Sequence, residues 1–410
     1  MRIICICIKI IYNDLTLKTH TARSRPRANI WRLLRMTLRK TLIGASIAAV
    51  LTSTGSFAAD LDSLQKQIDE LKAENNQILA NLENTSDSSS HSSATTIGGY
   101  GELHYNNLSS DLKNADKKEI DFHRFVLYFA HEFNNDIRFL SELELEHSIA
   151  GDGKNGEIEL EQAYIEFDTS DTANIKAGVF LIPVGMINET HEPPTFYGVE
   201  RNNVEKYIIP ATWWEGGVMY SANSASGISY DLAITSGLNN ADGVIRSGRQ
   251  KVSNAAADAF AYTGRVKYTG IKGLELSGTA QYQSDLAQGT TADEVSAILL
   301  EAHVKYTISG FTATALYADW DVDIDTTAES QNGYLVEASY KFTDKIGVFA
   351  RQTEIDYQKD VTTFVEGAAQ TDVGINYWPH EDVVIKADYQ MQNDDAGDFD
   401  GFNIGIGYQF

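Results

Sequence analysis

Polar and apolar residues alternate along most of the chain after residue 96. Residues 138–146, Arg-Phe-Leu-Ser-Glu-Leu-Glu-Leu-Glu, show the two-residue rhythm of a β-strand with one polar and one apolar face. Clusters of Gly, Asn, Asp and Ser separate such segments. The pattern predicts sixteen strands, at 97–106, 119–133, 136–147, 157–167, 173–185, 213–221, 228–235, 260–268, 273–283, 297–306, 311–320, 332–342, 346–354, 371–378, 382–392 and 401–410.

Short and long connections alternate between these strands. The short ones carry turn residues, as at Asn134-Asn135 and Ser309-Gly310, whereas 186–212, 236–259 and 355–370 are expected to be long. Membrane barrels sort their connections in this way, with tight periplasmic turns and long outer loops. We therefore predict an all-β fold over 97–410, a 16-stranded antiparallel transmembrane β-barrel. In that region no apolar run is long enough for a membrane-spanning helix.

The alternation also predicts which charged side chains face the lumen of the barrel. Arg138, Glu142 and Glu144 share one face of their strand, and Leu143 lies on the other. An Arg or Lys side chain that faced lipid at the midplane would cost about 2–4 kcal/mol, so the charged face is assigned to the lumen. By the same parity Arg124 points inward.

The strand at 157–167 changes phase part-way along. Glu157, Glu159 and Glu161 share the inward face, and the residues from Gln162 onward alternate one position out of step. A single extra residue in one strand produces such a shift. The sequence therefore predicts a β-bulge at this point.

Four segments precede the barrel. From Met36, a positive stretch at Arg39-Lys40, an apolar run and the small-x-small site ending at Ala58 predict a secretory signal peptide over 36–58. Residues 1–35 lack any coherent pattern, and we interpret them as a non-native upstream extension. Both cysteines, Cys5 and Cys7, lie there, so the rest of the chain forms no disulfide. A cytosolic protein without cysteines is the alternative that the signal peptide argues against.

The mature chain is expected to begin with a helix. Apolar residues at 61, 64, 68, 71, 78 and 82, with Asn75 in the same series, follow a heptad over 59–83. This spacing predicts a coiled-coil helix, with one amphipathic helix on a surface as the alternative. Residues 84–96 are rich in Ser and Thr and are typical of a flexible linker.

Charge divides the chain unevenly. The protein carries 33 basic and 57 acidic residues, but ten of the basic and only one of the acidic residues lie in 1–58. Residues 59–410 therefore carry a net charge of −33. Such a surface repels polyanions, which excludes a nucleic-acid partner.

The sequence lacks the common motifs of enzyme chemistry. The nine histidines include no His-Glu-x-x-His, and no Gly-x-Ser-x-Gly elbow, phosphate-binding loop or Cys-x-x-Cys occurs. The residues predict no enzyme, no catalytic group, no cofactor and no metal site.

The long connection 186–212 is the main candidate functional element. With Pro183 just before it, this region holds four of the six prolines, and apolar residues are interleaved with His191, Arg201 and Lys206. A solvated loop does not need that apolar content, so we predict that the loop folds into the lumen. A structured external loop at a subunit contact is the alternative.

Together these assignments give the residues expected to line a pore or its constriction: Arg124, Arg138, Glu142, Glu144, His191, Arg201 and Lys206. Charges of mixed sign across a pore set up a transverse field that sorts solutes by charge and dipole. The alternative is that these residues pair with one another and only keep the lumen ordered.

Several segments resemble the phosphate-selective porin O and P family. The resemblance rests on IGGYGELHYN at 97–106, DFHRF at 121–125, SELELEH at 141–147, EQAYIEF at 161–167 and NETHEPPTFYGVER at 188–201, and beyond residue 220 on the strand pattern alone. It implies a trimeric sixteen-stranded barrel that passes phosphate or other small anions. Arg124, Arg138, Arg201 and Lys206 match the basic lining expected of that family, whereas the inward glutamates depart from it.

Two functions fit these observations. The first is an outer-membrane porin, a diffusion channel for small hydrophilic solutes, with the family resemblance adding anions such as phosphate. Its expected partners are outer-membrane lipid and lipopolysaccharide, the solutes, and two further copies in a homotrimer. The second is a structural outer-membrane protein that links its barrel to the cell wall through a periplasmic coiled coil.

Overall fold

The computed structural model describes residues 94–111, 115–393 and 398–410, and all sixteen predicted strands are present there. The upstream extension, the signal peptide, the coiled coil and most of the linker lie outside the described residues. No helix in the described part of the chain has the length and apolar character needed to cross a bilayer. The strands are β1 (Thr95–Ser110), β2 (Lys117–Asn134), β3 (Ile137–Glu146), β4 (Ile158–Ser170), β5 (Ala173–Leu181), β6 (Trp214–Asn223), β7 (Ile228–Ser236), β8 (Phe260–Tyr268), β9 (Leu274–Gln283), β10 (Ala297–Ile308), β11 (Phe311–Val322), β12 (Ser330–Thr343), β13 (Ile346–Asp360), β14 (Thr363–His380), β15 (Val383–Asn393) and β16 (Phe399–Gln409).

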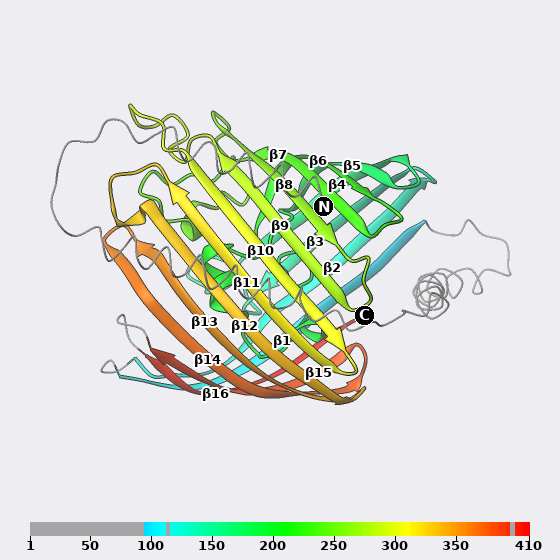
Figure 1. Cartoon of the computed structure of the whole chain (residues 1–410), viewed down its shortest axis with the longest axis vertical. Helices are drawn as coiled ribbons and strands as arrows, with labels where there is room; N and C mark the ends of the chain where they lie inside the picture. The colour runs from blue at the N-terminus through cyan, green and yellow to red at the C-terminus, as the bar shows by residue number, and fades with distance from the viewer. Residues whose placement is uncertain (1–93, 112–114, 394–397) are drawn as a thin grey trace. The chain divides into compact units, whose positions relative to one another are not determined.

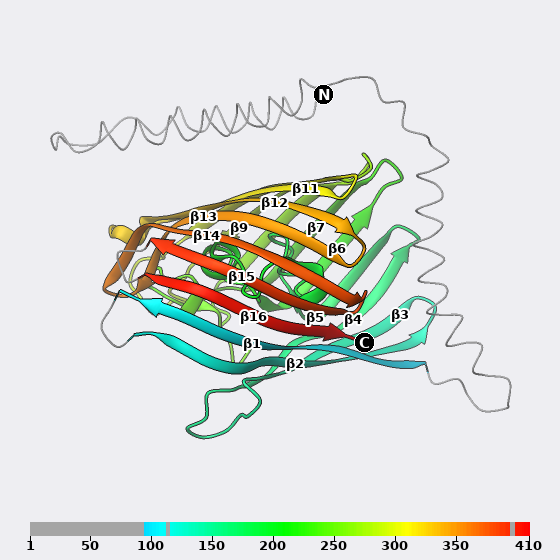
Figure 2. The same ribbon diagram turned by 90° about the horizontal axis from the view of Figure 1, so that it is seen from below.

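The strands form one closed antiparallel barrel. Each pairs with its neighbours in sequence, and β1 closes the sheet against β16, from Tyr100↔Gln409 to Ser110↔Phe399. Figure 1 shows the steep tilt of the strands, and Figure 2 shows β1 beside β16. The predicted 16-stranded barrel is confirmed. We call the end with the tight connections the turn end and the opposite end the loop end.

One predicted connection is wrong. Residues 355–370 were expected to form a long loop, but β13 and β14 continue as a ladder to Asp360↔Thr363. The register shifts twice along this extension, between Ile355 and Tyr357 and between Gln358 and Asp360. These irregularities break the polar–apolar rhythm, which is why the sequence pattern did not reveal the strand.

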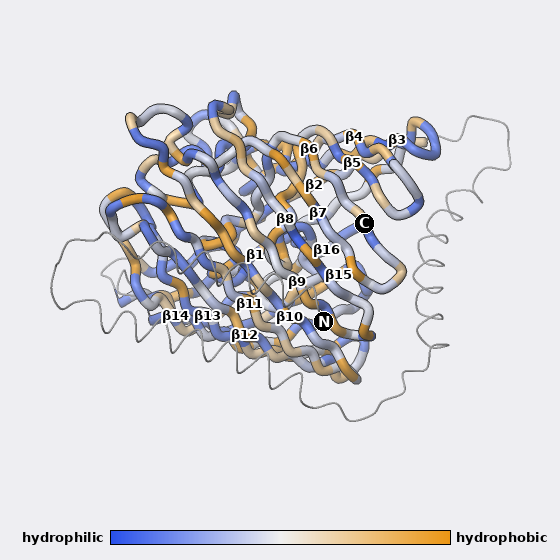
Figure 3. The backbone as a smooth tube through the Cα atoms, turned by 45° about the horizontal axis from the view of Figure 1, so that its top comes forward, coloured by the Kyte–Doolittle hydropathy of each residue, from blue (hydrophilic) through white to orange (hydrophobic). Residues whose placement is uncertain are grey.

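The outer face of the barrel is apolar. Leu232 and Ile234 on β7 are 56% and 53% exposed, and the same outward positions on β10 and β12 hold Leu300 and Val336. Orange segments recur along the strands of the barrel in Figure 3. In lipid only a closed sheet pairs every backbone donor and acceptor, so this surface suits the hydrocarbon of a membrane.

The predicted bulge is confirmed on β4. Glu142 pairs with Gln162 and Leu143 with Leu160, so Glu161 is the extra residue. Glu161 is 1% exposed, and the bulge turns it toward the lumen together with Glu159 and Gln162. Three inward side chains are thus brought into three consecutive positions of the ladder.

The connection between β5 and β6, residues 182–213, lies inside the barrel, as the sequence predicted. It contains the 3₁₀ turn η1 (Pro193–Thr195), which contacts β1, β15 and β16, and the π-helical turn η2 (Val204–Ile208), which contacts β11, β12 and β13. We call this segment the lumen loop. Its path crosses the interior from one wall to the opposite one.

Part of the interior is an apolar core rather than a water-filled lumen. The lumen loop, the β7–β8 connection and the inner face of β10–β13 contribute side chains to it, among them Ile182, Ile208, Trp213, Leu238, Ile245, Leu299, Leu316, Trp320 and Leu335. This core differs from the uniformly polar interior that strict alternation predicts. Burial of these apolar side chains, at roughly 25 cal/mol per Å², is what holds the loop inside.

Wall glycines make room for the loop. A Cβ on Gly407 would lie 2.2 Å from Cβ of Pro193, and one on Gly405 would lie 3.2 Å from the Val199 side chain. Glycine at these β16 positions thus lets the backbone of the loop approach the wall closely.

We expect Gly407→Ala to loosen the docked loop, because the new methyl group overlaps Pro193. Trypsin should then cut the loop after Arg201 and Lys206 faster in the folded, detergent-solubilised protein. Gly278→Ala is the matched control, since its Cβ would meet the nearest atom at 3.9 Å, an ordinary contact. Equal cleavage rates in the two variants would contradict this account of the wall glycines.

Candidate functional site

Hydrogen bonds close the lumen loop at its base. The Asn188 side-chain amide donates to the carbonyl oxygens of Ile182 and Trp213, at 2.8 and 3.0 Å, and its own oxygen accepts from the Trp213 N–H at 2.7 Å. Asn188 is fully buried. It therefore fastens the two ends of the loop to each other at the barrel wall.

A buried carboxylate organises the middle of the loop. Glu205 accepts from the backbone N–H groups of Met186 and Ile187, at 2.6 and 2.7 Å, and from the Asn202 amide at 2.8 Å. Burial raises the pKa of Glu205, although these donors favour its charged form. The side chain joins segments of the loop that are about 20 residues apart in sequence.

The far side of the loop is held by the opposite wall. Lys386 on β15 donates to the Gly198 carbonyl at 2.8 Å, and Asp388 accepts from the Val199 N–H at 2.6 Å. Trp320 on β11 donates to the Ile208 carbonyl at 2.7 Å. The loop thus bridges the barrel from β5 and β6 to β11 and β15, and it narrows the passage between them.

An acidic wall faces the beginning of the loop. We use this name for Glu102 on β1, Glu142 and Glu144 on β3, and Glu159 and Glu161 on β4, all of which are buried. Arg124 on β2 lies among them, with its Nε 2.9 Å from Glu102 and 3.8 Å from Glu144. The wall therefore carries an excess of negative charge that one arginine does not balance.

His191 of the loop supplies a second positive group to this wall. Its Nε2 lies 3.4 Å from Glu142 and 3.6 Å from Glu161, and its Nδ1 lies 3.1 Å from the Asn188 carbonyl. Burial opposes protonation of His191, but the two carboxylates outweigh it and raise its pKa to about 9. The imidazolium thus anchors the loop to the acidic wall at neutral pH.

Three arginines form a positive group near the acidic wall. Arg201 belongs to the lumen loop, and Arg246 and Arg249 belong to the β7–β8 connection. Arg201 donates to the Thr212 hydroxyl at 2.7 Å, Arg246 to the Ala211 carbonyl at 3.0 Å, and Arg249 to the Thr212 carbonyl. We call these residues the arginine group. In the described part of the chain, none of them forms an ion pair with a carboxylate.

The charges of the arginine group interact with one another and with carboxylates of the acidic wall. Burial and then Arg124 lower the pKa of Arg201, and burial and then Arg249 lower that of Arg246. Burial also lowers the pKa of Arg249, while Glu159 and Glu161 act in the opposite direction. Arginine stays protonated in proteins. The lowered pKa values therefore indicate that nearby carboxylates only partly balance the positive charges of these three arginines.

A cavity of about 340 Å³ lies between the lumen loop and the wall near the turn end. Three cationic side chains line it, Lys305, Lys341 and Arg351, and two carboxylates, Glu205 and Glu337. Arg351 is paired with Asp372 at 2.9 Å, and Lys341 lies 4.5 Å from the centre of the Trp378 ring. The cavity is wide enough for several water molecules or a small solute.

The predicted pore residues fall into separate places. Arg124, Glu142, Glu144 and His191 meet at the acidic wall, and Arg201 lies in the arginine group. Arg138 lies at the turn end, where it pairs with Glu166 at 2.7 Å and Asp168 at 2.9 Å.

Lys206 lies on η2 with its Nζ 5.5 Å from the centre of the Tyr207 ring. Sequence reasoning missed Arg246 and Arg249. The β7–β8 connection was expected only to be long, and nothing in its pattern indicated that it folds inward.

Comparisons with known proteins agree with this architecture. A family model described as Gram-negative porin matches residues 45–410. An uncharacterized protein of Aquifex aeolicus (strain VF5) is 29% identical over 353 residues, which cover 77% of this chain and 80% of that protein.

Three solved structures are similar in fold at much lower identity. An anion-selective porin from Comamonas acidovorans is 12% identical, with a TM-score of 0.56, over 78% of this chain and all of that one. The outer-membrane channel DcaP of Acinetobacter baumannii is 13% identical, with a TM-score of 0.53, over 77% and 97%. OmpT of Vibrio cholerae, in a trimer form, is 13% identical, with a TM-score of 0.52, over 77% and 100%.

We expect the stability that His191 provides to depend on pH. Its folded-state pKa of about 9 lies above the unfolded value of about 6.5, so the contribution is full below pH 6.5 and is lost as the pH rises through 9. Its size is on the order of 3 kcal/mol, at about 1.4 kcal/mol per pKa unit. Thermal unfolding of the wild type should therefore shift downward between pH 7 and 10.

His191→Gln is the matched variant, because it keeps a polar side chain and removes the titrating group. The difference in unfolding temperature between wild type and variant should shrink as the pH approaches 10. A difference that stays constant over this range would show that His191 does not act through its charge.

Proposed function

Because the chain belongs to the Gram-negative porin family, we propose that it is a passive channel for small hydrophilic solutes in the outer membrane. The observation that carries this proposal is the lumen loop, which crosses the barrel with His191 at the acidic wall and Arg201 in the arginine group. Solutes would pass through the space that these charges border. No step of bond making or breaking is involved, in keeping with a channel rather than an enzyme.

We infer that the channel prefers small anions, phosphate among them. Arg124, His191 and Lys251 already contact carboxylates of the acidic wall, Lys251 through Glu159. The arginine group, by contrast, is held by neutral carbonyl and hydroxyl oxygens. Its charge therefore remains available to a passing anion, as does that of Lys305 in the cavity. The resemblance to the phosphate-selective porin O and P family supports the same preference.

The remaining assignments follow from this function. The turn end would face the periplasm, and the loop end would contact lipopolysaccharide. Residues 36–58 would be removed on export, and 59–83 would form a coiled coil in the periplasm, upstream of the 84–96 linker and the 97–410 barrel. A homotrimer is proposed because the trimer form of OmpT shares this fold.

Packing inside the barrel favours a second candidate function. Inner-wall side chains such as Tyr100, Glu142 and Asn376 are fully covered. A barrel whose interior is filled in this way would suit a structural protein that links the outer membrane to the cell wall through the predicted coiled coil.

Planar-bilayer recording of the purified protein distinguishes the two candidates. A channel gives stable open steps of conductance, whereas the structural protein gives none. In a salt gradient the reversal potential should show a preference for anions. Silence at all voltages would overturn the channel proposal, and a cation preference would overturn the inferred sign.

Arg201→Ala should shift the reversal potential toward cations. One charge at about 4 Å in water is worth roughly 1 kcal/mol, so the anion-to-cation permeability ratio should fall about fivefold. Lys345→Ala is the control, because it removes an exposed cation from the turn between β12 and β13. Equal shifts in the two variants would mean that Arg201 does not border the passage.

A further inference from the structure

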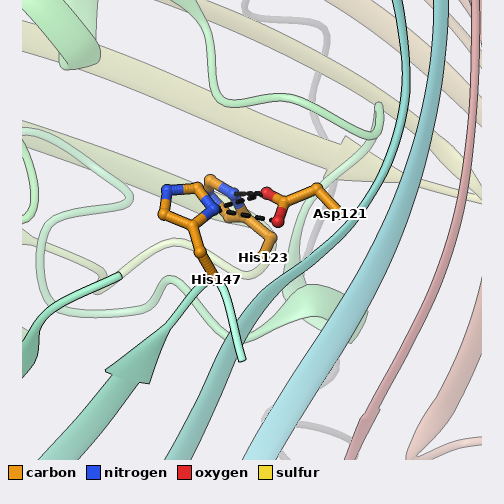
Figure 4. Close-up of side chains that lie close together, drawn as sticks. All are labelled: Asp121, His123 and His147. Atoms are coloured by element: carbon orange, nitrogen blue, oxygen red, sulfur yellow. Dashed lines mark hydrogen bonds and ion pairs between the residues drawn. The ribbon is translucent and has the colours of Figure 1, made fainter. Parts of the chain in front are cut away.

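Two histidines and an aspartate converge on the inner wall near the loop end. Asp121 and His123 belong to β2, and His147 directly follows β3. The Asp121 carboxylate lies 2.8 and 2.9 Å from His147 Nδ1 and 3.2 Å from His123 Nδ1. Figure 4 shows both rings turned with one nitrogen toward the same carboxylate. We call these residues the His–Asp group.

A second β-bulge turns two of these side chains toward the lumen, on the same side as Arg124. Glu102 pairs with Arg124 and Leu103 with Phe122, so His123 is the extra residue on β2. Asp121 stands opposite the inward-facing His104, and the His123 ring stacks on that of His104 at 4.8 Å. Without the bulge, Asp121 and Arg124 would lie on opposite faces of the strand. Bulges are frequent next to functional sites because they redirect side chains in this way.

The third residue is placed by an unusual backbone conformation. His147 has φ of +50° and Ser148 has φ of +61°, both in the left-handed region that non-glycine residues seldom adopt. The His147 N–H donates to the His123 carbonyl at 3.2 Å, which fixes the end of β3 against β2. This turn directs the His147 imidazole toward the carboxylate rather than along the barrel wall. Conformations of this kind cluster at ligand sites.

We propose that the His–Asp group binds a first-row transition-metal dication, with Zn²⁺ as its representative. Zn²⁺ and the other late first-row dications are commonly coordinated by two imidazole nitrogens and one carboxylate oxygen. These three ligands leave a fourth coordination position for water. Hard cations such as Ca²⁺ and Mg²⁺ prefer oxygen donors throughout, so the group disfavours them. The metal would replace the Nδ1 proton that each of the two rings now directs at Asp121, and each ring would keep one proton at Nε2.

The distances and the exposure of the group suit such an ion. Metal–ligand bonds of about 2.0–2.2 Å in a tetrahedral site place neighbouring ligand atoms roughly 3.4 Å apart. The contacts of 2.8 to 3.2 Å to Asp121 therefore need to open by only a few tenths of an ångström. The three side chains are 20% to 33% exposed, so an ion can reach them from the lumen.

Binding would have two effects on the barrel. It would tie the loop end of β2 to the start of the β3–β4 connection, and it would place a dication on the inner wall beside Glu102 and His104. The first effect concerns stability and the second the electrostatics of the passage. Neither depends on whether the barrel conducts.

Isothermal titration of Zn²⁺ into the folded, detergent-solubilised full chain without a histidine tag tests the proposal. We expect one site per chain with micromolar or tighter affinity. His123→Ala and His147→Ala each remove a direct ligand and should weaken binding at least about tenfold. Even the loss of a residue that only hydrogen-bonds to a metal ligand lowers metal affinity by about that factor. His131→Ala is the matched control, because this β2 histidine contacts Thr95 rather than a carboxylate.

Asp121→Asn provides a milder variant that keeps the shape of the side chain, in case an alanine variant does not fold. It should also weaken zinc binding at least about tenfold, and Ca²⁺ in large excess should not displace the metal. Zinc binding that is absent from the wild type, unchanged in all three site variants, or competed by Ca²⁺ at similar concentration would overturn the proposal. Because the readout is binding, a silent bilayer would not affect it.

Discussion

Closure of the sheet is the constraint on which the rest of this structure depends. A strand in hydrocarbon has no water to pair its N–H and C=O groups, so β1 must meet β16 and leave no edge. Closure then fixes the direction of every side chain, since residues along a strand alternate strictly between lipid and lumen. Within that constraint, a bulge is the local means of changing which residue faces inward. The two bulges inside β2 and β4 add His123 and Glu161 to the lumen, where each meets a histidine from outside its own strand.

The lumen loop shows how a segment with many polar groups is held inside a barrel. Its apolar residues join a core on the β10–β13 side, and its polar backbone is satisfied by side chains such as Asn188 and Glu205. The charged His191 lies on the other side, against Glu142 of β3 and Glu161 of β4. A loop built in this way has one apolar face that packs against the barrel wall and one polar face that is turned to the passage. This division explains why apolar and charged residues are interleaved along 186–212.

The sequence predicts the barrel well because a two-residue rhythm and membrane energetics point to the same answer. Every strand and the bulge at Glu161 follow from it, whereas the inward course of 186–212 follows from the apolar residues in that loop. The sequence pattern did not predict the hairpin at Asp360↔Thr363, because two register shifts interrupt the polar–apolar alternation of its strands. The arginine group was not predicted for a different reason. Arg246 and Arg249 lie in a connection without periodicity, and only the folded chain shows that their partners are the Ala211 and Thr212 carbonyls.

The way each charge is held decides what it can do in the lumen. An arginine that faces a carboxylate, as Arg351 faces Asp372, is largely neutralised and serves to order the wall. An arginine held by carbonyl oxygens keeps its position without losing its field, because a carbonyl carries only a partial charge. The protein uses the first arrangement on the barrel wall and the second on its inward loops. The arginines without a carboxylate partner therefore lie on the inward loops, although residues 59–410 carry a net charge of −33. The net charge of a barrel says little about the charge that a solute meets inside it.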